Sequence, residues 1–193
     1  MARNTDERRD ALRTRLTDIA ERQIGTAGLR SLRARDLAAE AGCAVGAIYN
    51  AVGDLNELVL AVNARTFARL GQAVSAARAE TPHAKLVAMA QAYHHFAAEN
   101  HLLWRALFDI ERPEGATAPD WYLAEMGRLF AHIAGPLHSL FPELDQTDHA
   151  LLTRALFSAV HGIVLLGLDD ASAGVPRDQI DRMLALTLER LLP

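Results

Sequence analysis

The chain has 193 residues, of which 50% are hydrophobic and 23% are charged. This balance is typical of a globular protein and excludes a disordered tail or a collagen-like rod. Its single cysteine, Cys43, excludes an intramolecular disulfide, and we therefore expect a reduced, cytoplasmic setting. The first residues mix arginine with acids, and no window holds about 18 uninterrupted apolar residues. We therefore expect neither a signal peptide nor a membrane span.

Charge is distributed unevenly along the chain, whose formal net charge is −4. Residues 1–35 carry nine arginines and five acids, whereas the rest of the chain carries eleven basic and nineteen acidic residues. A mildly basic N-terminal segment is thus followed by an acidic remainder of the chain. Such asymmetry is typical of a protein whose N-terminal end binds a polyanion, although solvated helices share it.

Apolar residues recur at helical spacing along the whole chain, and no segment alternates in the manner of a strand. The sequence therefore predicts an all-α fold. Between the helices we expect a flexible loop at 112–119, and we expect Gly135-Pro136 to disturb one helix because proline removes a hydrogen bond. The predicted helices span residues 6–27, 34–41, 45–51, 54–80, 84–100, 101–111, 121–141, 147–169 and 176–192.

The last two predicted helices, 147–169 and 176–192, are unusually apolar. A helix that is apolar on most of its surface must bury that surface against another element or another subunit. We therefore expect these two helices to form the interface of a homodimer.

Residues 37–52, LAAEAGCAVGAIYNAV, have the spacing of a helix-turn-helix. Ala38 is small where two helices would cross, and Gly42 permits the backbone sign change of the turn. The apolar core between the two helices would consist of Leu37, Ala41, Cys43 and Ile48. Two helices that merely flank a glycine inside an all-α core are the alternative interpretation.

The longer segment ARDLAAEAGCAVGAIYNAVGDLNELVLAV, residues 34–62, resembles the N-terminal DNA-binding domain of the TetR family of bacterial transcriptional regulators. Residues 156–168, LFSAVHGIVLLGL, are similar to the family branch with a C-terminal Trp-His-Gly motif, with Val160 in place of the tryptophan. The resemblance implies a three-helix DNA-binding domain over 1–53 and a ligand-binding and dimerisation domain over 54–193. It further implies a homodimeric repressor on a palindromic operator, released by a small apolar or aromatic effector.

Few residues of the helix-turn-helix can bind DNA. The arginines can bind phosphates or a guanine edge, the backbone N–H groups and the tyrosine hydroxyl can donate to phosphates, and the asparagine can pair with adenine. Solvated arginines and a core tyrosine ring are the alternatives. The candidate DNA contacts are Arg33, Arg35, Val45, Gly46, Tyr49 and Asn50.

The segment departs from the family where relatives place hydroxyls, a His-Phe pair and a lysine that bind phosphates. The residues at those positions here are Ala44, Ala47, Ala51, Val52 and Leu55. This departure motivates an alternative function, a helical dimeric ligand-binding or protein-interaction module with weak or lost DNA binding.

Aromatic and methionine side chains gather in the middle of the chain, where they can form the core or line an apolar effector cavity. His94, His95 and His161 could be the polar anchors of such a cavity. His161 is preferred because it lies in an otherwise apolar helix, where an unpaired polar group is costly; a satisfied core or interface histidine is the alternative. The candidate ligand-binding residues are Met89, Tyr93, Phe96, Trp104, Phe108, Trp121, Tyr122, Met126 and His161.

We expect no metal site, cofactor or catalytic centre. The histidines form no i, i+4 pair with a clear third ligand, and adjacent His94 and His95 should point to different faces of a helix. The sequence has neither a nucleophile elbow nor a phosphate-binding glycine loop, so we expect no enzyme activity.

Overall fold

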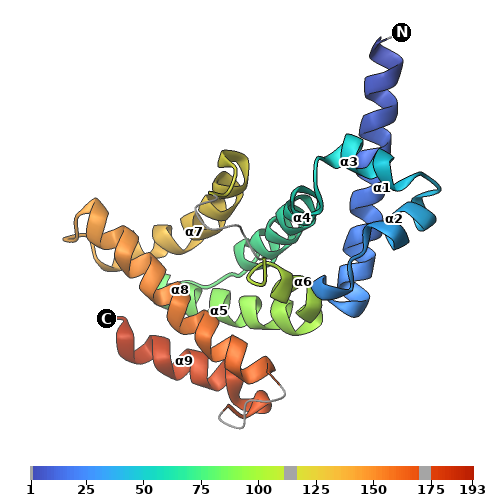
Figure 1. Cartoon of the computed structure of the whole chain (residues 1–193). Coiled ribbons are helices and arrows are strands. Elements are labelled where there is room, and N and C mark those ends of the chain that lie inside the picture. The colour runs from blue at the N-terminus through green and yellow to red at the C-terminus, as the bar shows by residue number, and fades with distance from the viewer. Residues whose placement is uncertain (1, 111–116, 170–174) are drawn as a thin grey trace. The chain divides into compact units, whose positions relative to one another are not determined.

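The computed structural model describes residues 2–110, 117–169 and 175–193, and side chains from Asp6 onward within them. Every regular element in these ranges is a helix, which confirms the all-α prediction (Figure 1). Two short 3₁₀ turns, η1 (Leu29–Ser31) and η2 (Arg177–Gln179), join longer elements. The α-helices are α1 (Ala2–Ala27), α2 (Ala34–Ala41), α3 (Val45–Val52), α4 (Leu55–Ser75), α5 (Pro82–Glu99), α6 (His101–Ala106), α7 (Asp120–Leu140), α8 (Gln146–Leu168) and α9 (Ile180–Leu191).

Two predicted helices begin four residues away from their observed starts, α1 at Ala2 rather than at residue 6 and α9 at Ile180 rather than at residue 176, and two other helices end earlier than predicted. Helix α4 ends at Ser75 rather than at residue 80, and Arg78 Nη1 donates to the Ser75 carbonyl over 2.7 Å. The alanine-rich residues after it are mostly exposed, so continuing the helix would bury little apolar surface. Helix α6 ends at Ala106 rather than at residue 111, where the N–H of Leu107 donates to the Trp104 carbonyl in a tighter turn.

Helix α7 continues through Pro136, so the disturbance expected there does not end the helix. Pro136 is buried, and burial of its ring offsets part of the lost backbone hydrogen bond. Most of the predicted loop at 112–119 lies outside the described residues, and the part from Thr117 to Pro119 precedes α7 without regular structure.

The chain divides into two compact units. Unit 1 comprises residues 1–66 and 100–122, and unit 2 comprises residues 67–99 and 123–193. Both units are therefore discontinuous in sequence, and unit 1 takes in 54–66 and 100–122 in addition to residues 1–53. The division at residue 53 into a DNA-binding and a ligand-binding domain remains a prediction.

Unit 1 is built on α1, which contacts both α2 and α3 (Figure 1). The shared core contains fully buried side chains from each of the three helices, Leu16, Leu37 and Ile48. Arg15 Nη1 donates to the Ala41 carbonyl over 3.2 Å, which satisfies a group at the open end of α2. Helix α2 is thereby fixed to α1 by apolar packing and by a polar contact.

The first half of α4 is also tied to unit 1. Arg65 Nη1 lies 2.6 Å from Asp18 Oδ1 and 2.9 Å from Glu21 Oε2, both on α1. The buried Asn63 donates from Nδ2 to the Ala106 carbonyl over 2.9 Å, at the end of α6. These contacts hold α1, α6 and this half of α4 together.

In unit 2, α5, α8 and α9 contact one another. Gly167 near the end of α8 is buried against the start of α9: a Cβ atom there would lie 2.5 Å from Ile180 Cδ1 and 2.7 Å from its Cγ1. Because Ile180 is itself fully buried, this close approach requires glycine. By length and composition α8 is apolar enough to cross a membrane, as core helices of many globular proteins also are.

Candidate functional site

The turn between α2 and α3 has the geometry that the sequence predicts. Gly42 adopts the left-handed conformation with φ of +66°, which disfavours a residue with a Cβ. The N–H groups of Gly42 and Cys43 donate to the Ala39 and Ala38 carbonyls over 3.3 and 3.0 Å, in the pattern that ends a helix at glycine. This turn fixes the direction of α3 relative to α2.

Helix α3 has one buried side and one exposed side. Ile48, Ala51 and Val52 are buried in the core of unit 1. The other side, which we call the α3 face, consists of Val45, Gly46, Tyr49 and Asn50. All four residues are exposed, with 38% of Val45 and 46% of Tyr49 accessible to solvent. The ring of Tyr49 is therefore not part of the core.

Ala44, the N-cap residue of α3, has no side-chain acceptor to offer to the first turn of the helix. The first N–H groups of a helix lack intrahelical partners and carry partial positive charge. The backbone at Val45 and Gly46 can therefore donate to an anion such as a phosphate.

Arg33 and Arg35 are exposed and flank the start of α2. Arg33 Nη1 donates to the carbonyls of Arg30 and Leu32 over 2.6 and 3.0 Å, so its guanidinium is folded onto its own chain. To bind a phosphate, the Arg33 guanidinium must break these two hydrogen bonds and form new ones with the phosphate oxygens. Cys43 is half-buried and packs against the core, as its inward position predicts.

Unit 2 contains an apolar cavity of about 40 Å³. The one polar side-chain group among its described lining residues is the Tyr93 hydroxyl, which lies 2.8 Å from Nδ1 of His161. The imidazole of His161 also stacks on Phe157 at a ring-centre distance of 5.5 Å. The cavity is lined by Val74, Leu86, Met89, Ala90, Tyr93, Leu129, Ile133, Leu156, Phe157, Val160 and Leu188.

The structure separates the candidate ligand-binding residues into two groups. In unit 2, Met89 and Tyr93 line the cavity, His161 bonds Tyr93, and Phe96 and Met126 lie outside the lining. Four candidates belong to unit 1 and do not line this cavity: Trp104 and Tyr122, which are buried, and Phe108 and Trp121, which are 41% and 43% exposed.

Several residues that line the cavity were not predicted from the sequence. Phe157 is the one whose position the sequence indicates most clearly. Phe157 precedes His161 by one helical turn on α8, so the two share a face. That spacing could have identified it. Leu129 and Ile133 on α7 carry no comparable signal, because their position depends on packing between helices far apart in sequence.

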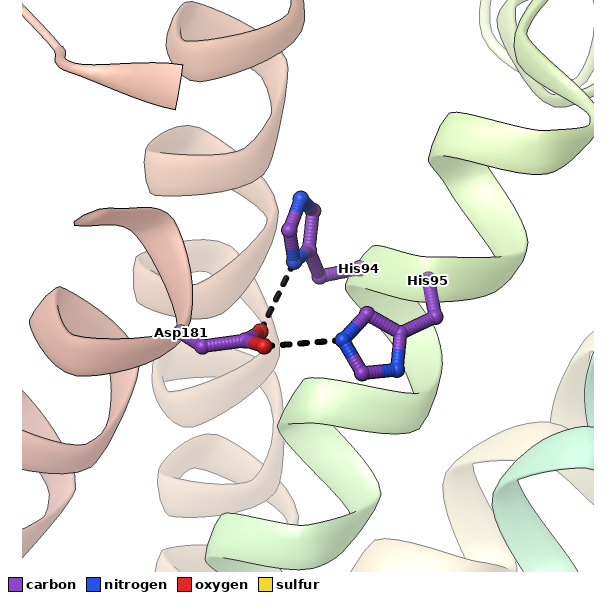
Figure 2. Close-up of side chains that lie close together, drawn as sticks. All are labelled: His94, His95 and Asp181. Atoms are coloured by element: carbon purple, nitrogen blue, oxygen red, sulfur yellow. Dashed lines mark hydrogen bonds and ion pairs between the residues drawn. The ribbon is translucent and has the colours of Figure 1, made fainter. Parts of the chain in front are cut away.

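We expected no metal site at adjacent His94 and His95, because they should point to different faces of a helix, but one acidic side chain contacts both rings. Nδ1 of His94 and Nε2 of His95 each lie 2.8 Å from a different oxygen of Asp181 on α9 (Figure 2). The two side chains leave α5 in different directions, but a carboxylate has two oxygens and an imidazole has a nitrogen on each side. One acid therefore reaches both rings.

Charge and burial act in opposite directions on Asp181. Burial alone would raise the pKa of this carboxyl, but the hydrogen bonds from His94 and His95 outweigh it and lower the pKa of Asp181 below its usual value. Asp181 is thus an ionised acceptor at neutral pH.

A comparison with protein families identifies one for this chain. The family model for the tetracycline repressor-like C-terminal domain matches residues 86–191, more than half of the chain. A comparison with curated proteins found no match.

Among solved structures, the chain is similar to a protein of unknown function from Rhodococcus sp. RHA1, with 24% identity, a TM-score of 0.73 and coverage of 94% of this chain and 95% of that one. It is similar to a TetR transcriptional regulator from the same organism, with 16% identity, a TM-score of 0.64 and coverage of 96% and 97%. It is also similar to the TetR family regulator PfmR from Thermus thermophilus, with 17% identity, a TM-score of 0.62 and coverage of 92% and 96%.

These structures share the fold over nearly their whole lengths, and the family model covers α5 to α9. The chain therefore belongs to the TetR family of transcriptional regulators.

Proposed function

We propose that this chain is a ligand-responsive repressor that binds a palindromic DNA operator as a homodimer in the cytoplasm. The proposal rests on the exposure of the α3 face. Its four residues are exposed, while the opposite side of the same helix is buried against α1 and α2. A helix with one side packed in the core and the other side exposed is the element that enters the major groove in helix-turn-helix proteins.

Some groups of the α3 face can position the protein on DNA, and others can recognise bases. The N–H groups of Val45 and Gly46 and the Tyr49 hydroxyl can donate to phosphates, which fixes the register of the protein. Asn50 can form two hydrogen bonds with adenine, which reads sequence. The surplus of arginine in residues 1–35 adds attraction to the phosphate backbone, although relatives' hydroxyls and lysine are replaced here.

Asn50→Ala is expected to weaken binding to the preferred operator duplex by about tenfold or more, because a good bidentate contact to a base contributes about 1–3 kcal/mol of discrimination. Binding to a scrambled duplex should hardly change. Fluorescence anisotropy with duplexes from the DNA upstream of the gene measures both affinities. Gln72→Ala, which removes an exposed amide in unit 2, is the control. Unchanged discrimination in Asn50→Ala, with loss of binding in Arg33→Ala, would overturn the assignment of Asn50.

We propose that α8 and α9 form the dimer interface. Large apolar side chains are exposed on both helices, with 51% of Leu166 and 44% of Leu186 accessible. Leu151 on α8 and Leu191 on α9 are each 59% exposed as well. Burial of such a surface by a second copy is favourable by roughly 25 cal/mol for each Å². Two recognition helices in the dimer would then enter successive major grooves about 34–36 Å apart.

The double variant Leu166→Glu/Leu186→Glu is expected to be monomeric, because dimerisation would bury two unpaired carboxylates in each subunit. Size-exclusion chromatography with light scattering measures the mass directly. Leu123→Glu on α7, where the side chain is 45% exposed, is the matched control and should remain dimeric. A double variant that keeps the dimer mass would exclude these helices as the interface.

We propose that the cavity in unit 2 binds the effector. Its lining is apolar except for the Tyr93 hydroxyl, which favours a small apolar or aromatic molecule with one polar group near Tyr93 and His161. A volume of about 40 Å³ holds only a few water molecules, so the cavity must enlarge to admit an effector. Such an expansion moves the helices that line it, which include α8 and α9 of the proposed interface. Effector binding would thereby alter the spacing of the recognition helices and release DNA.

A further inference from the structure

Three side chains of unit 2 bring potential metal ligands together (Figure 2). His94 and His95 lie on α5, and Asp181 lies in the first turn of α9. One ligand atom of each residue, Nδ1 or Nε2 of a histidine or a carboxylate oxygen, lies within 4.8 Å of those of the other two. Small side-chain movements would place all three around a single ion, since Zn–N and Zn–O bonds are about 2.0–2.2 Å long.

The donor set is chemically specific. Two imidazole nitrogens and one carboxylate oxygen suit borderline first-row divalent cations such as Zn²⁺, whereas Ca²⁺ and Mg²⁺ prefer oxygen ligands alone. Asp181 accepts a hydrogen bond from each of the two imidazoles, one on each carboxylate oxygen. To bind a divalent ion, each imidazole would offer the lone pair of the nitrogen that faces Asp181 and carry its hydrogen on the other ring nitrogen, and the carboxylate would offset one of the two positive charges of the ion.

The three side chains differ in how far they are exposed to solvent, so one side of the cluster is buried and the other is open. The side chain of His94 is 12% exposed, that of Asp181 is 39% exposed and that of His95 is 58% exposed. The cation can therefore enter from solvent beside His95 and keep a water molecule in its remaining position. Three protein ligands with one open position are a common zinc arrangement.

We propose that His94, His95 and Asp181 form a binding site for a divalent cation of the Zn²⁺ class that clamps α9 to α5. None of these three residues belongs to the proposed DNA contacts or lines the apolar cavity. Its ligands lie 86 and 87 residues apart in sequence, so bound metal cross-links the first and last helices of the family-model region. Bound metal therefore stabilises unit 2, because it binds the folded arrangement and not the unfolded chain.

Isothermal titration calorimetry with zinc chloride alone, on chelator-stripped full-length protein without a histidine tag, tests the site. The wild type should bind one Zn²⁺ per chain, and Zn²⁺ should raise its melting temperature. His95→Ala and Asp181→Asn should each weaken binding by about tenfold or more, since metal affinity depends on every ligand and its support. His83→Ala, which removes a histidine from the start of the same helix, is the matched control and should bind as the wild type does.

Because His95 is largely exposed, His95→Ala should fold normally, and circular dichroism checks this directly. Absence of stoichiometric Zn²⁺ binding to folded wild type would overturn the site and leave the cluster as a hydrogen-bonded contact between helices. Equal Zn²⁺ affinity of the wild type, His95→Ala and Asp181→Asn would also overturn it, because the ion would then bind elsewhere.

Discussion

Leu37→Ala is expected to reduce the free energy of unfolding of unit 1 by about 2–5 kcal/mol, the usual cost of truncating a buried leucine. Leu37 is fully buried on α2 and belongs to the core that joins α1, α2 and α3. Truncation removes apolar contacts and leaves a cavity between helices that the Gly42 turn holds in place. Chemical denaturation followed by circular dichroism measures the change.

Leu102→Ala is the matched control, because it removes the same atoms from a side chain in unit 1 that is 36% exposed. Its effect should be well below that of Leu37→Ala. Equal effects of the two substitutions would contradict the packing of α2 in this core. We also expect Leu37→Ala to weaken DNA binding, since α2 supports the helix that carries the α3 face.

Gly46→Glu is expected to weaken DNA binding by about a hundredfold or more. The new carboxylate would face the phosphates, and juxtaposed like charges cost several kcal/mol, where each 1.4 kcal/mol is a factor of ten. The free protein should fold normally, because no atom lies within 4 Å of a Cβ placed at Gly46. A negative charge in the first turn of a helix is also favourable. Fluorescence anisotropy at fixed salt measures the loss.

Gly127→Glu on α7 is the matched control. It adds the same charge at another helical glycine with no atom within 4 Å of the added Cβ, and it lies in unit 2. The control should bind DNA nearly as the wild type does, because the overall charge changes equally in both variants. Comparable loss in both variants would mean that net charge, rather than the α3 face, determines binding.

Local sequence signals predicted the helix-turn-helix accurately. The bounds of α2 match the prediction, and those of α3 differ by one residue, because a left-handed glycine and a strong apolar pattern determine both helices locally. The buried position of Ile48 and the exposed position of Asn50 also follow from helical spacing. The α3 face could thus be assigned from the sequence.

Features that depend on distant contacts could not be predicted. The end of α4 depends on how much apolar surface a longer helix could bury, and the end of α6 depends on a tight turn at Leu107; short-range periodicity reports neither. The aromatic residues of the middle helices look alike in sequence, yet Tyr93 lines the cavity in unit 2 whereas Trp104 is buried in unit 1. Asp181 follows the two histidines that it contacts by more than 80 residues, so no motif connects them.

The proposed function requires that the α3 face binds a specific DNA sequence. The most direct test is an anisotropy titration of the wild-type protein against duplexes tiled from the DNA upstream of its gene, at two salt concentrations. We predict tight binding to one tile and a steep loss of affinity with added salt, because each neutralised phosphate releases counterions. A folded dimer that binds no tile, or binds all tiles equally, would contradict the claim and favour a ligand-binding or protein-interaction module.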